Sequence, residues 1–262
     1  MNTEKVANHI VGWLKEYANK ANVKGFVIGV SGGIDSAVTS MLCAKTGLQT
    51  LCVEMPIHQA ESQVTRALNH ITFLKESFTN VTSTKVDLSH TFEAFKTANQ
   101  QEEQSHRIDL ALANTRARLR MSALYYLASI NGLLVAGTGN KVEDFGVGFY
   151  TKYGDGGVDL SPIADLLKSE VYELAKYLGI IDSIQNAAPT DGLFGDSRTD
   201  EDQIGASYDE LEWAMHMQDM GKEQKEFSGR QLEVFQIYTR LNSINQHKMN
   251  PIPICKIERS LK

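Results

Sequence analysis

The chain has 262 residues, 42% of them hydrophobic, and a formal net charge of -6. This size and composition can bury one large α/β core, so we expect a single domain over 1–262. An acidic balance argues against a nucleic-acid or anionic-membrane partner, because either would favour a basic surface. We therefore expect a small substrate.

The first predicted element is a surface helix over about 1–20. Apolar residues recur there at helical spacing, but charges interrupt them and no long apolar core follows, which is not typical of a signal peptide. No run in the chain approaches the length needed to cross a bilayer. We expect a cytoplasmic protein with no membrane partner. The apolar positions are Val6, Ile10, Trp13, Leu14 and Tyr17.

The next segments alternate between apolar strand patterns and helical patterns, which predicts right-handed βαβ units. A doubly wound, mostly parallel sheet with helices on both faces follows, and ligands bind such sheets at the carboxyl ends of the strands. The predicted strands cover about 25–31, 50–55, 82–87 and 133–137, and the predicted helices cover about 36–46, 59–77 and 106–131.

The sequence GFVIGVSGGIDS at 25–36 predicts a buried strand that leads into a phosphate-binding loop. Gly32 and Gly33 allow backbone angles that let successive amides point at one anion, in front of a helix N-terminus. The loop lacks the Walker lysine and the G-x-G-x-x-G spacing. Asp35 would repel a bare phosphate but could bind a magnesium ion that bridges phosphate oxygens. An ordinary turn capped by Asp35 is the structural alternative.

The three cysteines, Cys43, Cys52 and Cys255, are odd in number and form no C-x-x-C motif. A disulfide framework and a zinc site are therefore both disfavoured. We expect all three to be small buried hydrophobes in a reducing compartment.

Several further motifs follow in order: NTRARLRM at 114–121, GTGNKVEDFGVGFYTKYGDGGVD at 137–159, the stretch 162–168, and the pair His247 and Lys248. Together with SGGIDS they resemble the ammonia-dependent NAD synthetases of the ATP pyrophosphatase superfamily. The resemblance covers nearly the whole chain. It implies the adenine nucleotide alpha hydrolase-like fold, ATP as co-substrate and a homodimer with the dinucleotide site at the subunit interface.

The resemblance also implies roles for individual residues. ATP would be bound by Gly29, Val30, Ser31, Gly32, Gly33, Ile34, Asp35, Ser36, Thr138, Lys168 and Thr190. Mg²⁺ would be bound by Asp35 and Glu143. Deamido-NAD would be bound by Arg118, Lys152, Asp159, His247 and Lys248. The catalytic residues would be Lys152 and Asp155, with Asp155 as the base that takes a proton from ammonium.

The implied reaction has two steps. The carboxylate of deamido-NAD attacks the α-phosphorus of ATP and releases pyrophosphate, and ammonia then displaces AMP from the acyl-adenylate. Glutamine-using relatives carry a separate amidase domain, and synthetase motifs already fill these 262 residues. Free ammonia is thus the expected nitrogen source, although a partner subunit could supply it.

Two segments carry further expectations. The apolar residues of 106–131 occupy more than one helical face, which predicts burial on two sides, and the dimer interface would supply the second. The stretch 187–205 is rich in glycine and acids, which predicts a long loop that acts as a lid.

Alternative functions remain. Other members of the superfamily include GMP synthetase cores and enzymes that thiolate RNA or form lysidine, but RNA-modifying members should be basic. A nucleotide-binding sensor without chemistry is a second class, which the presence of both Asp35 and Glu143 disfavours. A Rossmann oxidoreductase would need the full fingerprint, which neither GTGN nor YGDGG provides.

Overall fold

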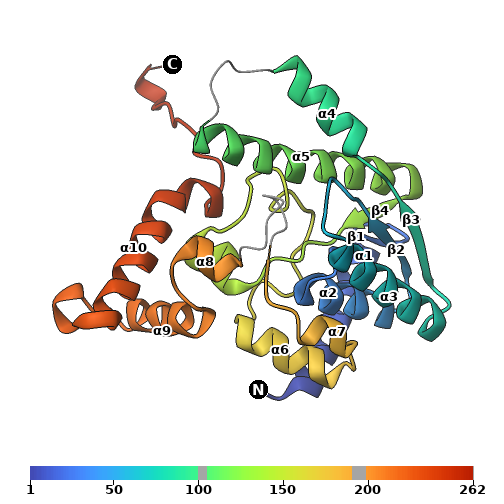
Figure 1. The fold of residues 1–262 in the computed structure, drawn as a ribbon, viewed down its shortest axis with the longest axis horizontal. Helices are drawn as coiled ribbons and strands as arrows, with labels where there is room; N and C mark the ends of the chain where they lie inside the picture. The colour runs from blue at the N-terminus through green and yellow to red at the C-terminus, as the bar shows by residue number, and fades with distance from the viewer. Residues whose placement is uncertain (100–104, 191–198, 262) are drawn as a thin grey trace.

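The structure, a computed structural model, describes residues 1–99, 105–190 and 199–261. Within them, one sheet has the strand order β3-β2-β1-β4, and every pairing is parallel (Figure 1). The predicted parallel α/β sheet is therefore confirmed. The strands are β1 (Gly25–Gly29), β2 (Gln49–Glu54), β3 (Val81–Lys85) and β4 (Leu133–Val135).

One face of the sheet packs on helices from both halves of the chain. Phe26 and Ile28 point to this face, and α1 buries a residue every three or four positions against the same cluster. This is the larger part of the core. The helices in contact with it are α1 (Thr3–Lys20), α2 (Ile34–Lys45), α3 (Glu61–Ser77), α6 (Lys168–Tyr177) and α7 (Asp182–Gln185).

The opposite face is covered by α4 (Ser89–Ala98) and α5 (His106–Asn131). The helix predicted over 106–131 matches α5, whereas α4 is not predicted from the sequence. One side of α5 packs on the sheet as expected, and the second burial, expected from a dimer interface, stays a prediction. Leu110, Tyr126 and Ile130 remain exposed on α5, because no described element of the chain packs over them.

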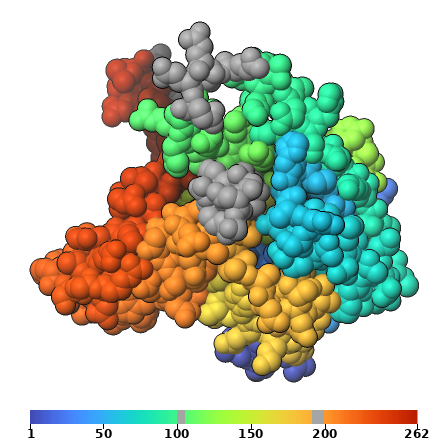
Figure 2. Space-filling model, in the orientation of Figure 1, coloured from blue at the N-terminus to red at the C-terminus, as the bar shows by residue number. Residues whose placement is uncertain are grey.

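A third cluster joins the C-terminal helices to the segment after β4. Val142 and Val147 of the π-helix η1 (Val142–Val147) pack with α8 (Asp200–Ile204), α9 (Tyr208–Asp219) and α10 (Gly229–Met249). In the space-filling view these helices, in orange and red, gather on one side of the sheet domain (Figure 2). Short 3-10 turns lie between α9 and α10 at η2 (Gln224–Glu226) and after α10 at η3 (Arg259–Leu261).

Two expectations need correction. The stretch 187–205 is not one loop, because α8 forms inside it from a capping box in which Thr199 and Asp202 bind each other's backbone amides. Residues 191–198 of the expected lid lie outside the described residues. Cys43 and Cys52 are buried as expected, but Cys255 is exposed in the tail that follows α10.

None of the described helices combines the length and the apolar character needed to cross a membrane.

Candidate active site

The loop after β1 (residues 30–36), predicted to bind phosphate and called the phosphate loop below, turns sharply at Gly32. Gly32 has φ +82°, and a Cβ there would lie 2.6 Å from the Gln63 carbonyl oxygen, so only glycine fits. Gly33 has an ordinary φ of -94°, so of the two glycines only Gly32 uses the conformational freedom of glycine. Two serine hydroxyls brace the loop: Ser36 Oγ accepts from Ser31 N at 3.2 Å, and Ser31 Oγ accepts from Gly33 N at 3.2 Å.

Asp35 does not cap α2, so the cap that the alternative assigns to Asp35 is not formed. Its carboxylate instead accepts hydrogen bonds from two distant residues, Asn140 Nδ2 at 3.1 Å and Lys168 Nζ at 2.6 Å. The first turn of α2 is therefore joined to the segment after β4 and to the start of α6. The predicted meeting of SGGIDS and GTGNKVE at one edge of the sheet is confirmed.

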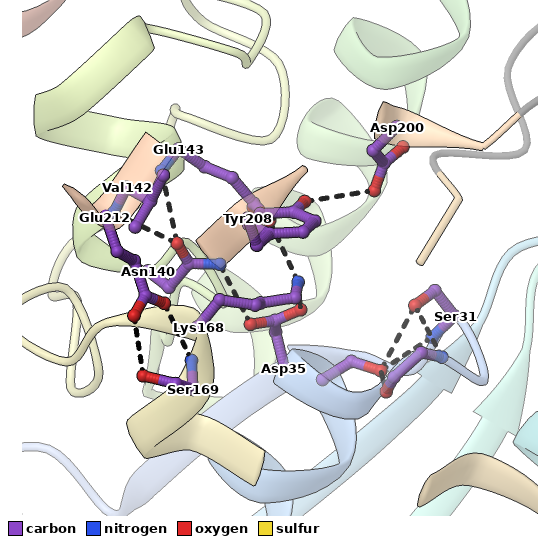
Figure 3. Close-up of polar contacts among 12 residues, drawn as sticks. Ser31, Asp35, Asn140, Val142, Glu143, Lys168, Ser169, Asp200, Tyr208 and Glu212 are labelled. Carbon is purple, nitrogen blue, oxygen red and sulfur yellow. Dashed lines mark hydrogen bonds and ion pairs between the residues drawn. The ribbon is translucent and has the colours of Figure 1, made fainter. Parts of the chain in front are cut away.

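Lys168 is the centre of a buried charged cluster (Figure 3). Its Nζ donates to Asp35 Oδ2 at 2.6 Å and to Glu143 Oε1 at 2.9 Å, and its side chain is 3% exposed. The Lys168 ammonium lies over the Tyr208 ring, 4.7 Å from the ring centroid. The Tyr208 hydroxyl donates a hydrogen bond to Glu143 Oε1 at 2.6 Å. We call Asp35, Glu143, Lys168 and Tyr208 the charged cluster.

Burial and mutual contact set the protonation of this cluster. Burial would lower the pKa of Lys168, but the two carboxylates outweigh it and raise that pKa, so the lysine stays charged. Burial raises the pKa of Asp35, against the effect of Lys168. Burial also opposes ionisation of Glu143, yet hydrogen bonds from Lys168 and Tyr208 hold its pKa below the usual value. The cluster thus keeps ionic groups next to the phosphate loop.

Asn140 fixes the position of Glu143. Its Oδ1 accepts from the backbone amides of Val142 and Glu143, both at 3.1 Å, while its Nδ2 donates to Asp35. Asn140 is fully buried. The first turn of η1 is therefore anchored through one side chain to the start of α2.

A cavity of about 280 Å³ opens beside the phosphate loop. Every residue that the sequence analysis assigns to ATP or to the metal lines it, and so does Asp155. These are Gly29, Val30, Ser31, Gly32, Gly33, Ile34, Asp35, Ser36, Thr138, Glu143, Asp155, Lys168 and Thr190. Asp144 also lines the cavity, and burial, together with Glu143, Asp155 and Asp35, raises its pKa to about 8.

Four of the five residues expected to bind the dinucleotide form a separate basic group. Arg118 Nε donates to the Lys152 carbonyl oxygen at 3.4 Å, and Lys152 Nζ donates to the His247 carbonyl oxygen. Lys248 Nζ donates to the Gly148 and Tyr150 carbonyl oxygens at 2.7 and 2.9 Å. These bonds bring together α5, the segment 148–152 and the end of α10. None of the four lines the cavity.

Asp159, the fifth, lies elsewhere. Its carboxylate accepts from Val135 N at 2.8 Å and from the Tyr125 hydroxyl at 3.0 Å, which ties it to β4 and α5. Asp155 is exposed and accepts from Thr151 N at 2.9 Å, so it closes the 151–155 turn at the cavity rim.

Residues 6–252 match the family model described as NAD synthase. The chain belongs to the NAD synthase family. It is 36% identical over 259 residues to the NH3-dependent NAD⁺ synthetase of Methanosarcina acetivorans, which covers 97% of this chain and 98% of the relative.

Two solved structures share the family fold over the full length. The NMN synthetase of Francisella tularensis superposes with a TM-score of 0.85 at 32% identity, covering 98% of this chain and all of the other. The NH3-dependent NAD synthetase of Campylobacter jejuni has a TM-score of 0.77 at 25% identity, again covering 98% and 100%. The doubly wound fold of the NAD synthase family is therefore shared throughout the chain.

Several site residues escape the sequence analysis. Asn140 lies inside the motif GTGNKVE, but its hydrogen bonds to Asp35 and the η1 amides join segments far apart in the chain. No motif in the sequence contains Tyr208 or Asp200. In the structure the Tyr208 hydroxyl lies 3.3 Å from Asp200 Oδ2. The available signal is a capping pattern, S-x-x-E at 207–210, which reveals a helix start and not a site.

Proposed function

We propose that this protein catalyses ATP-dependent amidation of deamido-NAD by ammonia, which makes it a C–N bond-forming ligase. One observation carries the proposal: Lys168 joins Asp35 of the phosphate loop to Glu143 of GTGNKVE at one cavity. Membership of the NAD synthase family and the similarity to NH3-dependent synthetases support it.

The first step activates a carboxylate. A carboxylate oxygen of the nicotinate ring attacks the α-phosphorus of ATP, the bond to the bridging oxygen breaks, and pyrophosphate leaves. The product is an acyl-adenylate. The loop amides after Ser31 and the N-terminus of α2 would hold the leaving phosphates, and the Lys168 ammonium would neutralise charge that develops there.

The donor atoms of the charged cluster fit a magnesium ion. Asp35 and Glu143 bring two carboxylates to the cavity beside the Lys168 ammonium, and oxygen is the donor that Mg²⁺ prefers. The described residues contain no group of three metal-binding side chains, so nucleotide phosphates and water would complete the shell. When bound, the ion would neutralise phosphate charge during adenylation.

The second step forms the amide. Ammonia attacks the carbonyl carbon of the acyl-adenylate, the bond to the adenylate oxygen breaks, and AMP leaves with that oxygen. Ammonium must first lose a proton, and Asp155 at the cavity rim is the base we propose for it. Excluding water from the cavity would protect the acyl-adenylate from hydrolysis.

The basic group would hold the substrate dinucleotide. Arg118, Lys152, His247 and Lys248 lie together within one chain, and cationic side chains suit the pyrophosphate of deamido-NAD. Lys152 would also neutralise charge near the reacting carboxylate. We propose a homodimer in which the exposed apolar face of α5 is covered, since Leu110, Tyr126 and Ile130 are otherwise in solvent. Asp159 would accept from the dinucleotide with the lone pairs that its bonds to β4 and α5 leave free.

The mononucleotide is the second candidate substrate. Amidation of nicotinic acid mononucleotide would yield NMN, the product in the name of the Francisella protein, whose structure superposes with the TM-score of 0.85. The chemistry at the carboxylate would be the same in both cases. Only the size of the nucleotide beyond the nicotinate ring would differ.

Purified protein with ATP and magnesium should therefore be given deamido-NAD or nicotinic acid mononucleotide, each with ammonium or glutamine. We expect NAD, AMP and pyrophosphate in equal amounts from deamido-NAD and ammonium. A higher kcat/KM with the mononucleotide would assign NMN synthesis instead. ATP cleavage without an amide product would contradict both assignments.

A further inference from the structure

Glu54 is the last residue of β2 and lines the cavity beside the phosphate loop. Its backbone is held from both sides. The Glu54 carbonyl oxygen accepts from Val86 N at 2.8 Å, and the preceding Val53 carbonyl oxygen accepts from Val30 N at 2.9 Å. These bonds extend the sheet past its last paired residues, so the Glu54 side chain starts from a rigid position one strand away from the loop.

The Glu54 carboxylate has no hydrogen bond among the described residues. Its side chain is 6% exposed, and Oε1 is fully enclosed without a donor. The nearest cation is Lys85 Nζ at 3.7 Å, on a side chain that is 57% exposed. Within the same part of the chain Oε2 accepts no hydrogen bond either and is not enclosed, and Glu54 is one of the residues that line the cavity.

Such a group calls for a ligand. A buried carboxylate without hydrogen-bond donors destabilises the folded protein. An ion pair at 3.7 Å to an exposed lysine offsets little of this cost. Natural structures satisfy nearly all of their buried polar groups, so an unsatisfied one next to a cavity is better explained by a donor that arrives with the ligand. Glu54 differs in this from Asp35 and Glu143, whose carboxylates already have donors.

The donors that ATP could offer to this carboxylate are neutral, namely the ribose hydroxyls and the base amino group. An ionised carboxylate only accepts hydrogen bonds and repels phosphate, so the phosphates belong to the loop after β1. Neighbouring strands are about 4.8 Å apart, so the end of β2 lies about one sugar width from that loop. Beyond Glu54 the cavity is lined by Met55, Pro56 and Val64, apolar side chains that suit a base.

We propose that Glu54 binds the ribose of ATP, with its carboxylate accepting a hydrogen bond from the 2′- or 3′-hydroxyl. The ribose lies between phosphates and base in ATP, as Glu54 lies between the loop and the apolar end of the cavity. This proposal rests on the proposed use of ATP. It makes Glu54 a specificity-determining residue that selects ribonucleotides over deoxynucleotides.

The test measures binding and turnover separately. Calorimetry gives Kd for ATP, 2′-deoxy-ATP, 3′-deoxy-ATP and inosine triphosphate, all with magnesium, on the wild-type protein, on Glu54→Gln and on Lys85→Met. Lys85→Met is the matched control, because it removes the ion pair and leaves the Glu54 carboxylate in place. The neutral amide of Glu54→Gln avoids burying an unpaired charge, so this variant should fold at least as well as the wild type.

We expect Glu54→Gln to weaken ATP binding by roughly tenfold or more, since a hydrogen bond to a charged group is lost. The same substitution should leave the Kd of one deoxynucleotide unchanged, and Lys85→Met should leave the preference for ATP intact. Equal weakening for ATP and both deoxynucleotides would overturn the proposal. So would a penalty that disappears only with inosine triphosphate, which lacks the base amino group.

The outcomes also separate this proposal from the function on which it rests. Wild-type protein that binds ATP in preference to deoxynucleotides through Glu54 but makes no amide would contradict the proposed reaction alone. Normal amide formation with unchanged discrimination in Glu54→Gln would contradict the ribose contact alone.

Discussion

Two buried polar groups on helix α2 are built in opposite ways. At its N-terminus, Asp35 shares the Lys168 ammonium with Glu143, next to the cavity. Further along the helix, Ser40 Oγ lies 2.9 Å from His70 Nε2 of α3, where both side chains are fully buried. The first group is ionic, whereas burial lowers the pKa of His70 to about 4 and keeps its ring neutral.

The charged cluster and the Ser40–His70 pair differ in what their burial costs. Burying paired charges contributes little or nothing to stability, whereas removing one partner leaves a buried unpaired charge and is strongly destabilising. A neutral hydroxyl–imidazole pair involves little desolvation of charge, so it can sit in the core at small cost. Substitutions in the charged cluster should therefore change activity, and substitutions in the Ser40–His70 pair should change stability alone.

Lys168→Met should have the largest effect. It leaves two buried carboxylates without their shared cation, so we expect the free energy of unfolding to fall by about 3–5 kcal/mol. Loss of a charge beside the phosphates should reduce kcat by roughly 100-fold or more. Urea unfolding and steady-state amide formation measure the two effects.

Lys222→Met is the control for Lys168→Met. Lys222 pairs with Glu226 at 2.9 Å on an exposed turn, so its loss should leave the free energy of unfolding close to the wild-type value. Activity near the wild-type value in Lys168→Met would contradict the role of the charged cluster.

His70 makes stability depend on pH. Its pKa is about 4 in the folded protein, below the ordinary value of 6.5, so unfolding takes up a proton between these values. The stabilisation from neutral His70 is complete above about pH 6.5 and is lost as the pH falls toward 4. From about pH 7.5 to about pH 4.5, the wild type should lose about 2–3 kcal/mol more than His70→Gln.

Urea unfolding of both proteins across that range checks this expectation. Amide formation by His70→Gln at neutral pH serves as the internal control and should match the wild type. A parallel pH dependence in the two proteins would mean that His70 is not buried in its neutral form.

Tyr208→Phe should have the smallest effect of the three. It removes one hydroxyl donor from Glu143 but leaves Lys168 in place, so we expect roughly a tenfold loss of kcat. The magnesium concentration needed for half-maximal rate should rise, because Glu143 loses part of its orientation. An unchanged magnesium dependence would show that Tyr208 serves packing alone.

The parts of the site that the sequence predicts are those carried by local patterns. SGGIDS and GTGNKVE follow buried strands directly, and parallel strand ends meet at one edge, so the convergence of Asp35 and Glu143 could be foreseen. The motif at 162–168 predicts that Lys168 lies at the ATP site. It does not predict that Lys168 bridges two carboxylates.

The rest depends on contacts between distant segments. Tyr208 reaches Glu143 because α9 packs on η1, and no spacing in the sequence encodes that packing. The unsatisfied carboxylate of Glu54 is likewise invisible in a strand that reads as apolar. The expectation for Cys255 is wrong because an apolar neighbourhood in sequence, PIPIC, stays exposed when no described element of the chain covers it.

The central claim is that the cavity adenylates a carboxylate, and isotope transfer tests it most directly. Deamido-NAD labelled with ¹⁸O in the nicotinate carboxylate should be converted with ATP and ammonium, and the AMP analysed by mass spectrometry. An acyl-adenylate predicts one ¹⁸O atom in each AMP released, because the attacking oxygen leaves with the phosphorus. Unlabelled AMP, or label in inorganic phosphate with release of ADP, would contradict it.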